Sequence, residues 1–179
     1  QHEIKDHATP FVDGTRDGNN IIKDRSGNDN HGTLEQDTTP KWVEESKVGS
    51  GAYEFDGYAE YIDCGNDSSV NLSNTGTISL WAKNYLEYPS SNTTTQYHGL
   101  ISKTSSGGNS GISYWIDWQG TNTFRRLRAG ISNGSASIFV HTNTDYGFGD
   151  NWRHIVFTWN GTNLYLYIDG ELIDQRSQT

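Results

Sequence analysis

The sequence predicts an all-β protein whose two antiparallel sheets stack as a sandwich. Apolar and polar residues alternate with a period of two along several segments, whereas no helical stripe of useful length occurs. The 179 residues include 20 Gly, only 3 Pro and 12% aromatic residues, a composition typical of strands joined by tight turns. A chain of this length is interpreted as one domain, residues 1–179.

Three runs of residues show the alternation most clearly. Every second residue is apolar in 78–82, 155–159 and 164–168. Successive side chains of a strand point to opposite faces, so each run predicts a strand with one face in the core.

Turn signals separate the predicted strands. Asn-Gly stands at 133–134 and 160–161, and Asp-Gly stands at 169–170. These dipeptides accept the positive φ angles that tight hairpins require. Segments 89–96 and 103–111 are polar and rich in Ser, Thr and Gly, which indicates loops within the domain.

Charge and hydropathy exclude several classes of partner. The chain has 13 Lys and Arg against 22 Asp and Glu, a formal net charge of −9. An acidic protein is repelled by phosphate backbones and by anionic membrane surfaces, so nucleic acid is not expected as a partner. No apolar run of about 18 residues occurs, and membrane insertion is not expected either.

The single cysteine and the Asn-x-Ser/Thr sites say little about the compartment. Cys64 has no disulfide partner within the chain, and its place in an alternating pattern predicts a buried, inert thiol. Five Asn-x-Ser/Thr sites favour an exported protein, though weakly in a chain so rich in these residues. They begin at Asn66, Asn71, Asn92, Asn133 and Asn160.

Ordered motifs resemble a known family. Residues 24–34 read Asp-Arg-Ser-Gly-Asn-Asp-Asn-His-Gly-Thr-Leu, and 51–57 read Gly-Ala-Tyr-Glu-Phe-Asp-Gly. Residues 152–156 read Trp-Arg-His-Ile-Val, and 164–170 read Leu-Tyr-Leu-Tyr-Ile-Asp-Gly. In this order they resemble the laminin G-like jelly-roll domains of the concanavalin A-like lectin/glucanase superfamily, which implies a concanavalin A-like jelly roll.

The resemblance also implies that a strand is missing. Relatives carry a closing strand after the Tyr-x-Asp-Gly hairpin that pairs with their opening strand, and no such segment follows residue 173 here. We therefore expect the edge to be completed by a strand from outside 1–179. It would come from the parent protein of which this domain is a part, or from a neighbouring subunit.

Clustered oxygen ligands make a calcium site one interpretation of the first motif. Ca²⁺ takes 6–8 oxygen ligands, and the candidates are Asp13, Asp17, Asp24, Asn28 and Asn30. In the family, a structural Ca²⁺ often sits beside this loop. The alternative is an Asx-rich turn whose side chains satisfy their own backbone. His31 is expected to order the loop through a hydrogen bond and not to bind the metal.

Catalysis is not expected, although glucanases share the family. Those enzymes present several carboxylates on one face of a strand. Glu54 and Asp56 share such a face here, but Tyr58 stands where the next acid should be. Gly57 turns the chain before Glu60.

Outward-facing aromatic and polar side chains predict a binding surface instead. Aromatic rings stack on the apolar faces of sugars while polar groups bind their hydroxyls. The same rings can equally be cross-strand pairs that stabilise a sheet. Parity alone does not tell which face of the strand at 114–118 is exposed. The candidates are Trp115, Asp117, Arg126, Arg128, Tyr165 and Tyr167.

These observations favour a non-catalytic, lectin-like carbohydrate-recognition module of a secreted or cell-surface protein. Arg126 and Arg128 share a strand face in an acidic chain, which favours acidic glycans. The alternative is a structural or adhesive building block of a surface layer, filament or adhesin. In that case its partners would be neighbouring subunits of the assembly rather than a glycan.

Overall fold

The computed structural model describes the chain in ten segments. They are residues 21–34, 40–49, 51–57, 60–72, 74–84, 94–103, 112–121, 123–133, 136–143 and 150–178. The chain divides into two compact units, Gln1–Asn71 and Leu72–Thr179. The interpretation of residues 1–179 as a single domain stays a prediction.

The first unit contains short strands in two small antiparallel sheets. One sheet has the order β1-β2-β5, and the other is the pair β3-β4. The elements are β1 (Ile21–Ile22), β2 (Gly32–Leu34), β3 (Lys41–Val43), β4 (Ala52–Glu54), β5 (Ile62–Asp63) and the short 3₁₀ helix η1 (Ser68–Val70). The residues at 24–31 therefore form the connection of the β1–β2 hairpin.

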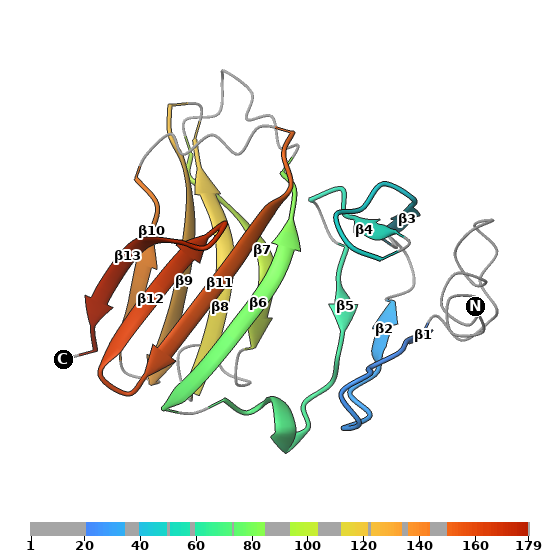
Figure 1. The fold of residues 1–179 in the computed structure, drawn as a ribbon, viewed down its shortest axis with the longest axis horizontal. Coiled ribbons are helices and arrows are strands. Elements are labelled where there is room, and N and C mark those ends of the chain that lie inside the picture. Colours follow the sequence, from blue (N-terminus) through green and yellow to red (C-terminus); the bar gives the residue numbers. More distant parts are fainter. Residues whose placement is uncertain are drawn as a thin grey trace. The chain divides into compact units, whose positions relative to one another are not determined.

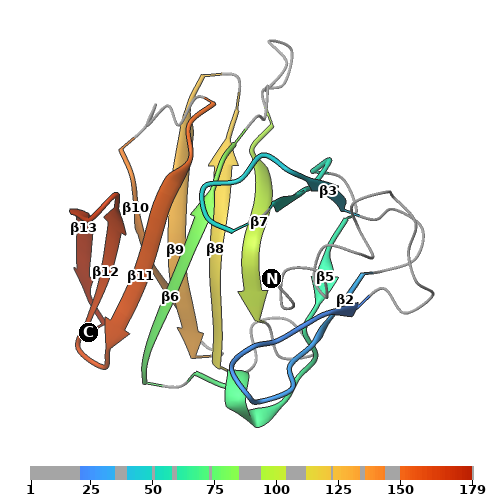
Figure 2. The same cartoon turned by 45° about the vertical axis from the view of Figure 1, so that its right-hand side comes forward.

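The second unit contains two four-stranded antiparallel sheets (Figure 1). Its strands are β6 (Thr75–Ala82), β7 (Gln96–Lys103), β8 (Ile112–Gly120), β9 (Arg125–Asn133), β10 (Ser137–His141), β11 (Arg153–Asn160), β12 (Asn163–Ile168) and β13 (Glu171–Ser177). Sheet I has the order β13-β12-β11-β6 and sheet II the order β10-β9-β8-β7. The turned view shows the same two layers (Figure 2). The predicted all-β sandwich is confirmed.

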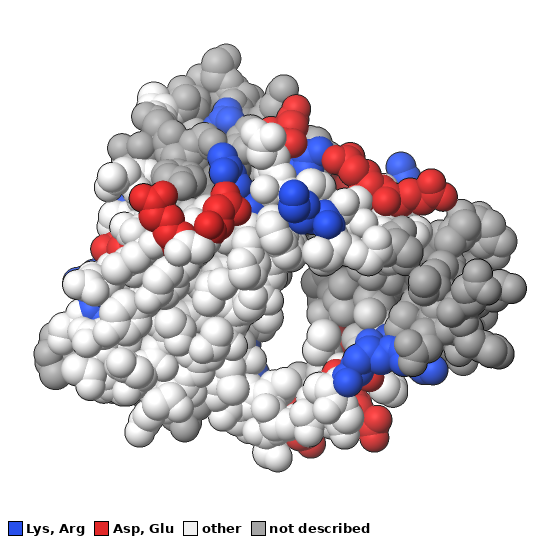
Figure 3. Space-filling model, in the orientation of Figure 1, with Lys and Arg blue, Asp and Glu red and all other residues white. Residues whose placement is uncertain are grey.

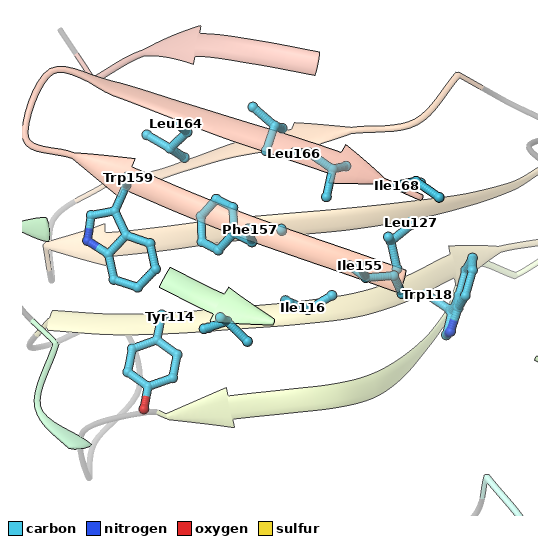
Figure 4. Packing of buried hydrophobic residues seen from close by; sticks show 13 residues of the cluster. Tyr114, Ile116, Trp118, Leu127, Ile155, Phe157, Trp159, Leu164, Leu166 and Ile168 are labelled. Atoms are coloured by element: carbon cyan, nitrogen blue, oxygen red, sulfur yellow. The ribbon is translucent and has the colours of Figure 1, made fainter. Parts of the chain in front are cut away.

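One cluster of buried apolar side chains joins the two sheets (Figure 4). In β11 and β12 buried residues alternate with half-buried ones, as the period of two predicts. The cluster comprises Ile78, Tyr114, Ile116, Trp118, Leu127, Ala129, Val140, Ile155, Phe157, Trp159, Leu164, Leu166 and Ile168. Because each sheet gives one face to this core, the other faces of the two sheets point in opposite directions.

Tight turns connect the strands of sheet I where the sequence predicts them. Asp169 and Gly170 have φ angles of 53° and 86°. Two consecutive positive φ angles are what a type I′ hairpin turn needs. Gly161 has a φ of 82°. The side-chain oxygen of Asn160 accepts hydrogen bonds from the backbone N–H groups of Thr162 and Asn163. The turn predicted at 133–134 lies partly outside the described residues.

Side chains of β13 also bind the edge of the other sheet. The Asp174 carboxylate accepts a hydrogen bond from the backbone N–H of His141 at 3.0 Å. The Arg176 guanidinium donates to the carbonyl of Phe139 at 3.4 Å. Unpaired backbone groups of an edge strand invite pairing with another chain. These two contacts occupy backbone groups of β10 and tie the sheets together on this side.

The last described strand extends beyond residue 173, the end of the hairpin in the sequence analysis. Residues 171–177 form β13, which pairs with β12 through a register shift between Leu166 and Tyr167. Within the described residues, β13 and β6 are the outer strands of sheet I. Completion of an edge by a strand from outside residues 1–179 stays a prediction.

A glycine of β6 makes room for a tryptophan of the core, which gives a test of the packing. Gly76 pairs with Trp159, and a Cβ at Gly76 would lie 2.3 Å from Cζ2 of the indole. Trp159 is 2% exposed, so its ring has no space to move away. We expect Gly76→Ala to lower the free energy of unfolding by about 1–3 kcal/mol in urea titrations.

The control for this substitution is Gly99→Ala in β7. No atom lies within 4 Å of a Cβ at Gly99, and the residue is exposed. Both substitutions remove the same backbone freedom, so only the clash differs. Equal unfolding free energies for the two variants would contradict the packing described here.

Candidate functional site on the outer faces of the sandwich

The structure decides which face of β8 is exposed. Tyr114, Ile116 and Trp118 are buried in the core, with exposed fractions of 7%, 0% and 3%. Trp115 and Asp117 alternate with them and therefore lie on the outer face of sheet II. The sequence did not tell which face of this strand is exposed, and in the structure it is the face of Trp115 and Asp117.

The six predicted ligand-binding residues do not come together in one place. Trp115 and Asp117 of β8 and the two arginines of β9 lie on the outer face of sheet II. Tyr165 and Tyr167 lie on the outer face of sheet I, because their neighbours Leu164, Leu166 and Ile168 are buried. The core separates the two groups, so no single small ligand contacts both.

A tight ion pair lies at the centre of the outer face of sheet II. The Asp117 carboxylate accepts hydrogen bonds from Nε and Nη2 of Arg128, at 2.9 Å and 2.7 Å. The side chains are only 13% and 14% exposed. The Arg128 guanidinium also lies 4.8 Å from the ring centroid of Tyr97 and 5.4 Å from that of Phe139. The Arg128 guanidinium is therefore engaged by the Asp117 carboxylate and by two neighbouring aromatic rings.

The second arginine is bound in a similar way. Nε of Arg126 donates a hydrogen bond to the amide oxygen of Gln119, whose amide nitrogen donates to the Tyr97 hydroxyl at 3.0 Å. The Arg126 guanidinium lies 5.7 Å from the ring centroid of Phe124. Sequence reasoning missed Gln119 and Tyr97, because only the β7–β8 register, which is shifted near Gly99, brings them side by side.

Trp115 lies against the neighbouring strand. It pairs with Gly130 of β9, and a Cβ there would lie 2.4 Å from Cζ2 of the indole. The ring therefore covers the backbone of β9 where a side chain is missing. On this face the predicted binding residues form the cross-strand contacts that the sequence analysis weighed as the alternative.

The outer face of sheet I is built from hydroxyl groups and rings. The Thr77 and Thr158 hydroxyls are 2.9 Å apart, and the Ser79 hydroxyl is 2.8 Å from Nε2 of His154. The His154 ring stacks on Trp81, with 5.0 Å between the ring centroids. The rings of the two predicted tyrosines of β12 stack with each other at 6.5 Å.

The outer face of sheet I carries almost no charge. On β6, β11 and β12 its outward residues are Thr75, Thr77, Ser79, Trp81, His154, Val156, Thr158, Asn160, Asn163, Tyr165 and Tyr167. None of these described residues is acidic, and His154 is the only one with a basic side chain. Figure 3 shows a broad area without charged residues over these strands, with charged groups gathered beyond one end. The ion pair of Arg153 with Asp169 lies at that end of β11 and β12.

The loop of the first motif is held together by its own hydrogen bonds. The Asp24 carboxylate accepts from the backbone N–H and the hydroxyl of Ser26, both at 2.7 Å, and from the backbone N–H of Asn30 at 3.0 Å. Nδ1 of His31 accepts from the backbone N–H of Asp24 at 3.0 Å. The expected ordering role of this histidine is confirmed. These bonds lower the pKa of Asp24, chiefly through Ser26.

Other polar side chains of the loop also take part in hydrogen bonds. The Ser26 hydroxyl accepts from the Asn28 amide at 3.0 Å, and the Asn30 amide donates to the Ser69 hydroxyl at 2.8 Å. No group of three or more His, Cys, Asp or Glu that could hold a metal ion occurs among the described residues. Asp13 and Asp17 lie outside them, and the calcium site stays a prediction.

Two further expectations are decided by geometry in the first unit. Cys64 is exposed, so its predicted burial is wrong. The two-residue strand β5 ends at Asp63, before it could carry Cys64 into a core. Partial desolvation, with Asp63 and Asp24 nearby, raises the pKa of the Cys64 thiol, which keeps it in the weakly nucleophilic neutral form.

The carboxylates considered for catalysis do not share one strand. β4 ends at Glu54, and the chain turns at Gly57, whose φ is 77°. The Glu60 carboxylate accepts a hydrogen bond from the backbone N–H of Asp56 at 2.6 Å, as part of this turn. The strand that would align several acids at a period of two is absent from this described segment.

The sequence model of the concanavalin A-like lectin/glucanases superfamily matches residues 56–179. The chain therefore belongs to this family, and the resemblance drawn from its motifs is confirmed over that range. The match includes the whole sandwich and begins within the Phe-Asp-Gly motif, whereas the loop at 24–34 lies outside it. The family indicates a lectin-like or adhesive module, and laminin G-like domains are generally non-catalytic.

No curated protein and no solved structure matches the chain. In the described part of the chain, no helix has the length and apolar character needed to cross a membrane.

The Asp24 turn predicts a dependence of stability on pH. The folded state lowers the pKa of Asp24 from its ordinary value of 3.8. The resulting stabilisation is complete above that value and is lost as the pH falls through the lowered pKa. We expect Asp24→Asn to lower the melting temperature at neutral pH and to flatten its fall below about pH 4.

Asp29→Asn is the matched control in the same loop. Asp29 is exposed and has a φ of 58°, a conformation that Asn also tolerates. Thermal unfolding from pH 7 to pH 2.5 compares the three proteins. Identical curves for Asp24→Asn and Asp29→Asn would contradict the role given to Asp24.

The ion pair on sheet II predicts strong coupling between its two partners. Arg128→Gln leaves the Asp117 carboxylate without its partner in a largely buried place, which costs about 3–5 kcal/mol. The double variant Asp117→Asn/Arg128→Gln leaves no charge behind and should lose less than the sum of the two single variants. Chemical denaturation measures this cycle, and strictly additive losses would show that the pair is not coupled.

Proposed function

We propose that this chain is a non-catalytic carbohydrate-recognition module of an exported protein. The observation that carries the proposal is the outward placement of aromatic rings beside hydroxyl and other polar groups on a rigid sandwich. Half-buried rings such as those of Tyr165 and Tyr167 can stack on sugars, while neighbouring polar groups bind sugar hydroxyls. Membership of a family of lectin-like modules supports this proposal.

The non-catalytic part of the proposal rests on the carboxylates. Glycosidases need two carboxyl groups on either side of the bond that they cleave. Glu54 is exposed at the end of β4, and Glu60 is bound to a backbone N–H of its own turn. Neither has a second carboxylate held opposite it by a strand in the described residues.

Export to the outside of the cell or to its surface fits the exposed Asn-x-Ser/Thr sites. Asn66, Asn71 and Asn160 are exposed in the structure. Asn92 and the side chain of Asn133 lie outside the described part of the structure. The single cysteine is compatible with any compartment.

A structural or adhesive building block is the second candidate. The observation that favours it is the broad outer face of sheet I, which carries no acid, lysine or arginine on β6, β11 and β12 (Figure 3). Protein interfaces likewise have cores depleted of charged residues and enriched in aromatic ones. In this case neighbouring subunits, rather than a glycan, would cover the face.

A glycan array separates the two functions. We expect the purified protein, on its own, to bind a subset of the glycans on the array. An array without any binding, together with concentration-dependent self-association in light scattering, would favour the building block instead.

The array and a melting curve should also be run with Ca²⁺ and with excess chelator. A cation that binds only the folded state raises stability by mass action, about 2.7 kcal/mol at 100 times its dissociation constant. An unchanged melting temperature would exclude a structural Ca²⁺ held by Asp24, Asn28 and Asn30 with Asp13 and Asp17.

A further inference from the structure

We propose that the glycan site is the outer face of sheet I and that its ligand is a neutral, extended glycan chain. The site is formed by Trp81, His154, Tyr165 and Tyr167, with the hydroxyl groups of Thr77, Ser79 and Thr158 beside them. This inference rests on the proposed function, and it adds the face and the chemical class of the ligand.

The outer face of sheet II is the weaker of the two candidates. Its two arginines favour an acidic glycan, but both are engaged by other groups. Arg128 is in a two-pronged ion pair with Asp117, which offsets its charge. Arg126 donates to Gln119 and lies on the ring of Phe124. An incoming carboxylate or sulfate would have to compete with Asp117 for the guanidinium.

The rings of sheet I, by contrast, stack with each other along its outer face. Tyr165 and Tyr167 are two residues apart on β12, and their rings are close to parallel, with 29° between the planes. Across the sheet, Trp81 and His154 form a second stack with 27° between the planes. Two aromatic platforms on one face suit a chain of sugars better than a single sugar, because each platform can bind a different unit.

Hydroxyl groups lie beside the tyrosine platform, because Thr158 of β11 is opposite Tyr165 and the hydroxyls of Thr77 and Ser79 follow on β6. The Thr158–Thr77 and His154–Ser79 pairs join β11 to β6 on the outer face. The Thr158 hydroxyl also donates to the carbonyl of Gly76 at 3.0 Å and has no second proton to donate. The hydroxyls of Thr77 and Ser79 keep further capacity for hydrogen bonds. Such groups can bind sugar hydroxyls without the cost of burying a charge.

The lack of charged side chains on this face favours a neutral ligand. On β6, β11 and β12 the outward residues include no acid and no Lys or Arg. No side chain there offers a permanent positive charge to a uronate or a sulfate. A second copy of the chain is disfavoured because each carries a formal net charge of −9. A neutral glycan meets neither penalty.

The test measures binding of the whole chain to named polysaccharides by affinity electrophoresis and calorimetry. The neutral probes are mannan, xyloglucan and dextran, and the acidic probes are polygalacturonate and heparin. We expect binding to at least one neutral polysaccharide and none to the acidic ones. Tyr165→Ala and Tyr167→Ala should each weaken the neutral binding about tenfold.

Matched variants on the opposite face serve as controls. Tyr97 of β7 is 56% exposed on sheet II, so Tyr97→Ala removes the same side chain there and should leave binding unchanged. Arg126→Gln should also leave it unchanged. Thermal unfolding checks that each variant is folded, and Thr77→Glu places a charge on the exposed site without removing a ring.

The outcomes separate the two levels of the proposal. Binding to neutral polysaccharide that Tyr97→Ala or Arg126→Gln abolishes, or binding to the acidic probes alone, would overturn the site and leave carbohydrate recognition standing. No binding to any probe here or on the glycan array would overturn the proposed function itself. The site is supported if Tyr165→Ala, Tyr167→Ala and Thr77→Glu weaken binding to neutral polysaccharide and the sheet II variants do not.

Discussion

The structure depends on one constraint, the shared core between two sheets whose strands alternate with a period of two. Ile155, Phe157 and Trp159 are buried because they face the other sheet. The residues between them must then point outward, whatever their polarity. A shift by one residue would turn the whole apolar set toward solvent, so the core fixes the register and with it the composition of both outer faces.

Large aromatic rings fit into this arrangement because glycines lie beside them. A Cβ at Gly76 would clash with the indole of Trp159, and one at Gly130 would clash with that of Trp115. In each pair the two residues face one another on neighbouring antiparallel strands. The same device supports a ring in the core and a ring on the outside. A glycine opposite a tryptophan is therefore a packing requirement here, and not a sign of a flexible strand.

The sequence predicts the strands whose alternation is strong, such as those at 155–159 and 164–168, and the turn at Asp169-Gly170. It also places Tyr165 and Tyr167 outward, because the apolar residues between them leave no other choice. It does not tell which face of 114–118 is exposed, since Trp115 and Trp118 are equally apolar. Nor does it show that the candidate residues divide between two sheets, because sheet membership depends on pairing between distant segments.

The hydrogen bonds and ion pairs of some polar side chains could not be predicted from the sequence either. The Asp24 turn and a calcium site need the same residues, so the sequence alone does not show the hydrogen bonds that Asp24 accepts from Ser26 and Asn30. Likewise, the arginines of β9 form a cationic spot when they are considered alone. The ion pair with Asp117 becomes evident only when the β8–β9 register places Asp117 opposite Arg128. Charged groups can be interpreted only together with their partners.

The two outer faces therefore have different properties, one a network of committed charges and rings, the other an uncharged surface of hydroxyls and rings. Mapping of backbone amide chemical shifts by NMR during titration with neutral oligosaccharides of glucose and mannose tests this difference most directly. The account predicts that shifts gather on β6, β11 and β12. Shifts confined to β7, β8, β9 and β10 would contradict it.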